Sequence, residues 1–157
     1  MKSSKLKICV VGNMLTLPWS PDHAGIVQTL EKFKTEGCIG DYRIADCAQH
    51  HNSNMDIIDT IKAFAPDLVL HGMTDSLSSQ WAEKIRAVLP KTIQVMSMWD
   101  YRPQTLNYDG LWDTWKKSGP YLDLITLSNK GQMAWWKKDF GVETMYWAHG
   151  CVVKDVE

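Results

Sequence analysis

KICVVGNMLTLPWSPDHAG, residues 7–25, is the stretch that decides the fold. Its first part, Ile8 to Val11, is a continuous apolar run of the kind found in parallel strands that are covered on both faces. A turn at Gly12 and a loop follow, and a helix is predicted to begin near Ser20, whose hydroxyl can accept a hydrogen bond from the free amides of a first helical turn. A strand that leads into the start of a helix is typical of sites for anionic ligands.

The rest of the chain repeats this alternation of strand and helix. Strands are predicted at Lys7–Val11, Tyr42–Ala45, Asp67–His71, Ile93–Trp99, Leu122–Leu127 and Glu143–Trp147. Helices are predicted at about Pro21–Glu36, from Asn52 or Ser53 to Ala65, from Ser76 or Ser78 to Leu89, at Leu111–Lys117, and at Asn129–Phe140 after a cap at Ser128. This order predicts an α/β fold, a three-layer Rossmann-like parallel sheet of about six strands with helices on both faces. We expect one domain over residues 1–157.

The composition excludes several classes of partner. Of the 157 residues, 45% are hydrophobic and 22% are charged, which is ordinary for a globular domain. The formal net charge of −1 gives no indication of a nucleic acid or an anionic membrane as a partner. No stretch approaches the roughly 20 apolar residues of a membrane span. We therefore expect a cytoplasmic protein without a membrane span.

The four cysteines have no CxxC spacing, and Cys9 falls inside a predicted buried strand, so free thiols in a reducing compartment are favoured over disulfides. Cys47, His50 and His51 form a Cys-x-x-His-His cluster, but a closed zinc site needs four ligands and no second pair is present. A solvated loop is the favoured interpretation, and no metal is expected.

The standard cofactor motifs are missing. The segment after the first strand holds one of the three glycines of a GxGxxG fingerprint, and only Asp46 could supply the acidic residue that closes the second strand of a dinucleotide site. The Walker loop and the GxSxG elbow are also absent. No cofactor is predicted.

Topology nevertheless predicts where a ligand binds, because ligands of open α/β sheets bind beyond the carboxyl ends of the strands. The candidates at those ends are Gly12, Asn13, His71, Gly72, Trp99, Asp100, Ser128 and His149.

Three of the candidates could carry chemistry. Asp100 follows an apolar strand and precedes a loop, where a catalytic base or a hydroxyl-binding group would lie, although a loop-capping aspartate is an equal alternative. His71 is either a core-edge histidine or a residue that faces the ligand. His23 lies in a predicted first helical turn, where the dipole favours a neutral imidazole usable as a donor or base; a surface histidine is the alternative.

Four stretches together resemble a known family: Pro18–Gly25, PDLVLH at Pro66–His71, VMSMWD at Val95–Asp100, and Tyr121 to Gly150 with its Asp123, Ser128 and Gly141. In this order they are similar to the N-terminal half of GT-B glycosyltransferases, of the CgeB-like or glycosyltransferase family 4-like branch. The resemblance covers nearly the whole chain.

The resemblance implies the acceptor-binding half of a nucleotide-sugar-dependent glycosyltransferase, which transfers a sugar to a hydroxyl once it is paired with a donor-binding domain. The nucleotide sugar would bind through a C-terminal domain that this chain lacks. A truncated chain, a separate partner domain, a homo-oligomer and a loss of the activity are all open, and the chain alone is expected to be inactive. Asp100, His23 and His71 would be catalytic. The substrate-binding set would be Gly12, Asn13, Trp19, Gly25, Trp99, Ser128 and His149.

A non-catalytic Rossmann-like module, which binds a small molecule or docks on another protein, is the alternative function. An exposed tryptophan-rich surface on the sheet edge or the last helices would favour it. The tryptophans that decide this are Trp112, Trp115, Trp135 and Trp147.

Overall fold

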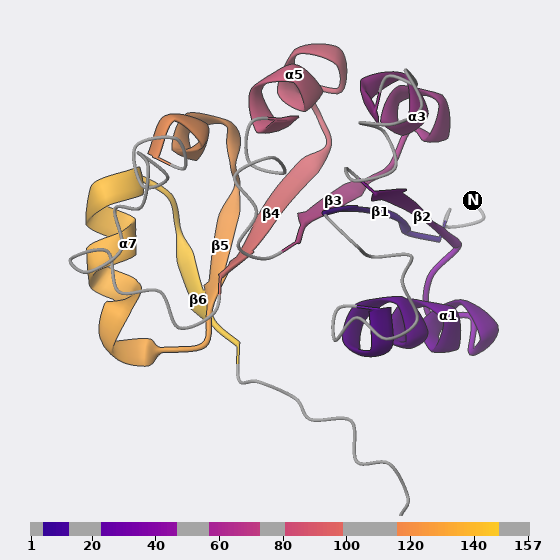
Figure 1. Cartoon of the computed structure of the whole chain (residues 1–157), viewed down its shortest axis with the longest axis horizontal. Helices are drawn as coiled ribbons and strands as arrows, with labels where there is room; N and C mark the ends of the chain where they lie inside the picture. The colour runs from indigo at the N-terminus through magenta and orange to yellow at the C-terminus, as the bar shows by residue number, and fades with distance from the viewer. Residues whose placement is uncertain (1–4, 13–22, 47–56, 73–80, 99–115, 148–157) are drawn as a thin grey trace, which may run out of the picture.

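Six parallel strands form the centre of the computed structural model (Figure 1). The structure describes residues 5–12, 23–46, 57–72, 81–98 and 116–147. The strands are β1 (Lys7–Gly12), β2 (Asp41–Asp46), β3 (Leu68–His71), β4 (Ile93–Met98), β5 (Leu124–Leu127) and β6 (Thr144–Tyr146). Their order in the sheet is β2-β1-β3-β4-β5-β6, and every neighbouring pair is parallel.

Helices follow β1, β2, β3 and β5 as predicted, whereas most of the helix predicted at Leu111–Lys117 lies outside the described residues. The helices are α1 (Gln28–Thr35), which a π-helical turn at His23–Val27 precedes, α3 (Ile57–Phe64), α5 (Trp81–Val88) and α7 (Met133–Phe140). Two short 3₁₀ turns lie at Gly119–Tyr121 and Lys130–Gln132. In the part of the chain that the structure describes, no helix is both long enough and apolar enough to cross a membrane.

The helices cover both faces of the sheet, which confirms the predicted three-layer α/β fold. Helix α1 lies on one face, where Leu30 packs with Ile8 and Val10 of β1 (Figure 1). Helices α3 and α5 lie on the other face, over Cys9 and Val11. Helix α7 joins this second face, where its side chains pack with those of β4 and β5. Successive residues of β1 therefore contact different layers, as the period of a strand requires.

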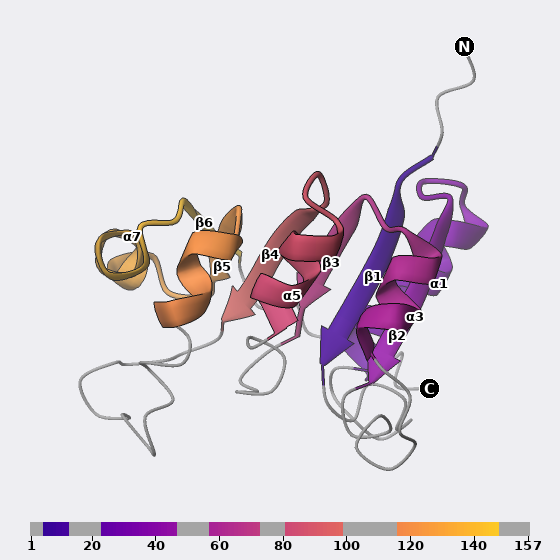
Figure 2. The same ribbon diagram turned by 90° about the horizontal axis from the view of Figure 1, so that it is seen from above.

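The strand order reverses between β1 and β3. The chain passes from β1 to β2 on one side and then returns to place β3 on the opposite side of β1. All strands point the same way, so their carboxyl ends lie along one edge of the sheet (Figure 2). In a doubly wound sheet, the point where the order reverses is where ligands bind.

Two aspartates fix the opposite, amino edge of the sheet. Asp67 lies just before β3, and its carboxylate accepts a hydrogen bond from the backbone N–H of Lys7, 2.8 Å away. Asp123 lies just before β5 and accepts from the backbone N–H of Gln94 at 2.7 Å. Each carboxylate satisfies a backbone donor at the start of the neighbouring strand, so the same device sets the register at two places in the sheet.

The structure corrects two local predictions. The helical spacing of Ile26, Val27, Leu30 and Phe33 predicts that they face the core, but Phe33 is 40% exposed in α1, whereas Leu30 is buried. The cap before the last helix is Asn129, whose side chain accepts from the N–H of Gly131 at 2.9 Å, and not Ser128. The predicted cap at Ser20 lies outside the described residues.

Charged side chains tie α1 to the edge strand β2. The Tyr42 hydroxyl donates to Glu31 at 2.6 Å, and this carboxylate raises the pKa of Tyr42 to about 12. Lys34 pairs with Asp41 at 2.7 Å, and its ammonium lowers the pKa of that carboxyl. Both pairs are exposed, so they orient the helix more than they stabilise the fold.

The end of α7 gives a first prediction. Gly141 has φ of 67° and ψ of 19°, and its N–H donates to Lys137 to close the helix. A Cβ there would meet no atom within 4 Å, so a Gly141→Ala variant suffers from backbone strain alone. We expect it to lower the free energy of unfolding by about 1 kcal/mol, measured by urea denaturation.

Gly25 is the matched control for this prediction, because a Cβ there also meets no atom within 4 Å and its φ is not in the left-handed region. A Gly25→Ala variant should lose no stability. Equal losses in the two variants would contradict the strain explanation.

Candidate functional site

The carboxyl ends of β1 and β3 meet closely where the strand order reverses. Val11 is in register with His71, and the N–H of Gly72 donates to the Val11 carbonyl at 2.6 Å. A Cβ on Gly72 would lie 3.1 Å from that oxygen, so a larger residue would push the two strand ends apart. Gly12, His71 and Gly72 therefore form one continuous corner at the edge of the sheet where ligands of such folds bind.

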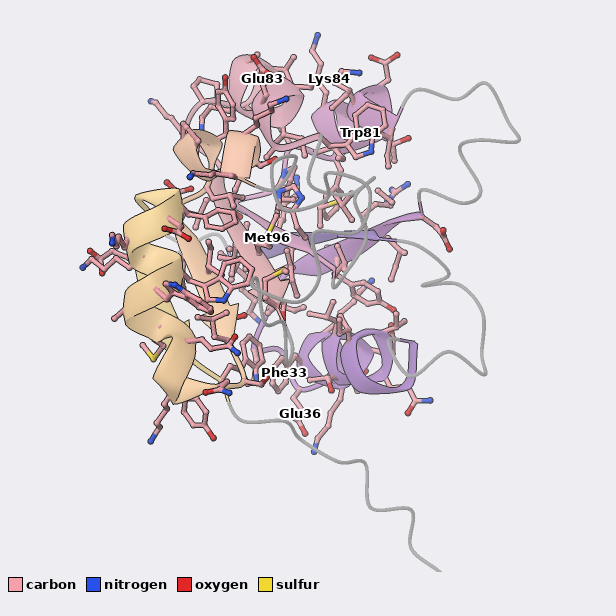
Figure 3. All side chains as sticks on the ribbon, turned by 60° about the vertical axis from the view of Figure 1, so that its left-hand side comes forward. Phe33, Glu36, Trp81, Glu83, Lys84 and Met96 are labelled. Carbon is pink, nitrogen blue, oxygen red and sulfur yellow. The ribbon has the colours of Figure 1, made fainter. Side chains whose placement is uncertain are left out.

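His71 is fully buried at this corner, on the face that α5 covers. Its ring nitrogen Nε2 lies 2.9 Å from Oε1 of Gln94, which is also fully buried. Met96, the register partner of His71 on β4, is labelled at the centre of Figure 3 and marks this level of the sheet. The predicted histidine thus belongs to a buried polar pair between two adjacent strands.

Gln94 is the residue of this corner that sequence reasoning missed. It stands in β4, IQVMSM, as the one amide among mostly apolar residues. A polar residue inside a buried strand must find partners, and this is the signal that could have drawn attention to it. Its side-chain nitrogen donates to the carbonyls of Ala82 and Tyr121, each at 3.0 Å.

Asp46 brings a carboxylate to the same edge. It ends β2, in register with Gly12 of β1, and is only 2% exposed. Among the candidates of the sequence it was considered only for a dinucleotide motif that the chain does not have. It therefore places a buried carboxyl group beside the last residue of β1, at the carboxyl edge of the sheet.

The predicted site residues fall into two groups. Gly12 and His71 lie together at the corner, whereas Ser128 follows β5, farther along the same edge and half-buried. Gly25 is exposed in the π-helical turn that precedes α1, and the backbone of His23 begins that turn. The remaining predictions lie outside the described residues: Asn13, Trp19, Trp99, Asp100 and His149.

Helix α5 carries a separate group of side chains on its outer surface. Figure 3 shows Trp81, Glu83 and Lys84 on α5, with Phe33 and Glu36 on the far side of the sheet. The Lys84 ammonium lies 4.3 Å from the centre of the Trp81 ring. The indole N–H of Trp81 is buried, and no group in the described ranges accepts a hydrogen bond from it, which reduces the stability that the ring gains by packing on the core.

Cys9 is not suited to be a nucleophile. It is fully buried in β1, and burial raises the pKa of its thiol from 9.0 to about 12, although Arg43 acts in the opposite direction. Folding favours the protonated thiol. This group therefore makes its full contribution to the free energy of unfolding below pH 9.0, and that contribution is lost as the pH rises toward about 12.

We therefore predict that iodoacetamide labels the exposed Cys38 in the native protein and leaves Cys9 unmodified until urea unfolds the chain. Mass spectrometry of tryptic peptides measures both sites in one sample. Equal rates at the two cysteines would contradict the burial of Cys9.

Within the ranges that the structure describes, no three His, Cys, Asp or Glu residues lie close enough to hold a metal ion. The Cys47, His50 and His51 cluster lies outside those ranges. No family model and no curated protein sequence matches this chain. The functional proposal therefore depends on the geometry of the carboxyl edge and on the residues that the sequence places there.

Proposed function

We propose that this domain binds a small molecule at the carboxyl edge of β1 and β3, as the acceptor-binding half of a nucleotide-sugar-dependent glycosyltransferase. The observation that carries the proposal is the reversal of strand order at β1 and β3, which brings His71 and Gly72 beside Gly12. Polar groups at such a reversal are positioned to bind a ligand. Asp46 adds a carboxylate on the neighbouring strand.

The chemistry of sugar transfer fits a domain of this kind. The acceptor hydroxyl attacks the anomeric carbon of the donor, the bond from that carbon to the nucleotide phosphate breaks, and a base takes the hydroxyl proton. In our proposal Asp100, two residues after the last residue of β4 in the sequence, is the first candidate for the base. The nucleotide sugar would be held by a donor-binding domain, supplied as a partner.

The proposal is tested by ligand titration of the free domain. We expect millimolar glucose or another simple sugar to shift the amide resonances of Gly12 and Gly72 in NMR spectra, because these backbones line the corner. The amides of Gly119 and Gly141 lie near the amino edge, next to the starts of β5 and β6, and should not move. A ligand at 100 times its dissociation constant also stabilises a protein by about 2.7 kcal/mol, which a thermal melt detects.

UDP and UDP-glucose are the matched probes for the titration. If UDP, added without any sugar, shifts the amide resonances of Gly12 and Gly72, the result would contradict an acceptor site and indicate a nucleotide-binding enzyme. No shift with any of the three probes would contradict small-molecule binding at this edge.

A docking module remains the second candidate, and one surface favours it. Met145, Tyr146 and Trp147 at the edge strand β6 are 46%, 40% and 55% exposed. Trp135 on α7 is half-buried, while Trp112 and Trp115 lie outside the described residues. A row of exposed apolar side chains on an edge strand is typical of an interface. Sedimentation of the free protein as a dimer, without any ligand response, would favour this second function.

A further inference from the structure

The side chain of Gln94 is held in one orientation. Its amide nitrogen lies 3.0 Å from two backbone carbonyl oxygens, those of Ala82 in α5 and Tyr121 in the 3₁₀ turn before β5. Carbonyl oxygens can only accept, so the NH₂ group must be the end that faces them. The amide oxygen Oε1 is thereby directed to His71.

This orientation decides which nitrogen of His71 carries the proton. Nε2 of the imidazole lies 2.9 Å from Oε1 of Gln94. An amide oxygen has no hydrogen to give, so Nε2 must be the donor of this bond. Gln94 brings no charge to balance an imidazolium, and both side chains are fully buried. These contacts place a proton on Nε2, and the uncharged amide of Gln94 favours the neutral ring over the imidazolium.

We infer that Gln94 is a positioning residue for His71: it fixes the orientation of the ring and the Nε2–H tautomer, and so makes Nδ1 the accepting nitrogen at the carboxyl end of β3. The tautomer follows from the contacts of the free protein. That a ligand contacts this histidine rests on the proposed function. In that function Nδ1, rather than Nε2, is the ring nitrogen that accepts a hydrogen bond from a ligand at the corner.

Further hydrogen bonds among neighbouring residues hold Gln94 in this position. The backbone N–H of Gln94 donates to Asp123, and the guanidinium of Arg86 bonds both Asp123 and the Tyr121 carbonyl. Gln94 is therefore held by its main chain and its side chain at once, from α5, β4 and the segment before β5. Because no part of this support depends on a ligand, the tautomer should be present in the isolated protein.

The test is ¹⁵N NMR of the ring nitrogens in protein labelled at histidine, at neutral pH. The two neutral tautomers and the imidazolium give different shifts for Nδ1 and Nε2, and a His71→Gln variant assigns the signals among the five histidines. We expect a single Nε2–H tautomer, with a ring proton that exchanges slowly with water and shows a nuclear Overhauser effect to the Gln94 side chain. A proton on Nδ1, or an imidazolium, overturns the inference.

Removing the amide tests the role of Gln94 directly. In a Gln94→Met variant, which keeps the length of the side chain, Nε2–H loses its acceptor. We expect its proton resonance to move upfield and part of the population to shift to the Nδ1–H form. Unchanged His71 signals in this variant would overturn the role of Gln94. The matched control is Thr92→Val, which removes a buried 2.8 Å hydrogen bond to the Pro66 carbonyl and should leave His71 unaltered.

A second measurement needs no variant and covers the case in which Gln94→Met does not fold. Both protons of the Gln94 side-chain amide should be protected from hydrogen exchange, because each bonds a carbonyl. Fast exchange of these protons overturns the assigned orientation.

The tautomer and the proposed function can fail separately. The NMR measurements use the free domain without a sugar, whereas the proposed function fails when no sugar shifts the corner. A fixed Nε2–H tautomer in a domain that binds no sugar would leave the geometry intact and contradict only the glycosyltransferase proposal.

Discussion

An Arg86→Met variant has a free energy of unfolding about 3 kcal/mol lower than that of the wild type, because one guanidinium joins three segments of the chain. Nη1 donates to the carbonyls of Pro90 at 3.1 Å and Thr92 at 3.0 Å, which form the turn from α5 into β4. Nη2 donates to the Tyr121 carbonyl at 2.9 Å and to the Asp123 carboxylate at 2.6 Å. Urea denaturation measures the loss.

Most of this loss comes from the carbonyls and not from the ion pair. The Arg86 and Asp123 side chains are 26% and 43% exposed, and water screens a pair of that kind. The Met side chain keeps the apolar stem but removes the guanidinium donor from the carbonyls of Pro90 and Thr92. The Tyr121 carbonyl and the Asp123 carboxylate also lose it, although both still accept from Gln94. Hydrogen bonds to a charged group contribute about 1.5–3 kcal/mol each when buried, and partial hydration reduces the sum.

Two further variants separate the shape of the guanidinium from its charge. Arg86→Lys keeps the charge, but an ammonium cannot reach four acceptors in two directions, so we expect at least half of the loss to remain. Lys137→Met breaks the ion pair with Glu143, also 2.6 Å long but 55% and 68% exposed, and should cost less than about 0.5 kcal/mol. If Arg86→Lys unfolded with the same free energy as the wild type, the planar shape of the guanidinium would not be needed to hold these acceptors.

The fold was predictable because apolar runs and helix breakers alternate along the chain. Buried strands such as β1 and β5 consist mainly of apolar residues, and Gly37 and Pro90 follow the helices at their ends. The error at Phe33 shows the limit of this reasoning. Helical spacing predicts which side chains share a face of the helix, but not which of them the core covers: Leu30 is buried and Phe33 is 40% exposed.

The candidate site was predictable only in its location. The topology placed Gly12 and His71 at the carboxyl edge, and the structure brings them to one corner. The partner of His71 could not be predicted, because Gln94 is 23 residues away and the contact depends on the register of β3 against β4. The role of Asp100 stays a prediction, since that residue lies outside the described ranges.

Trp136→Ala should have the largest effect of the substitutions considered for the core. The side chain is fully buried beneath α7, and its ring stacks on that of Phe140 with centroids 4.8 Å apart. Truncation leaves a cavity among the side chains of β4 and β5, which are held by the sheet and cannot collapse into it. We expect a loss of about 4 kcal/mol in the free energy of unfolding, measured by urea denaturation.

Comparison with two other variants identifies the source of this loss. Trp136→Phe keeps a ring against Phe140 but leaves Gln132 without the indole N–H, 3.5 Å away, so an intermediate loss is expected. Trp147→Ala removes the same indole from a site that is 55% exposed, and should cost less than about 1 kcal/mol. Similar losses at Trp136 and Trp147 would contradict the packing of α7 on this face of the sheet. A small loss at Trp147 together with a large one at Trp136 separates the tryptophan that stabilises the core from the one that is exposed at the surface.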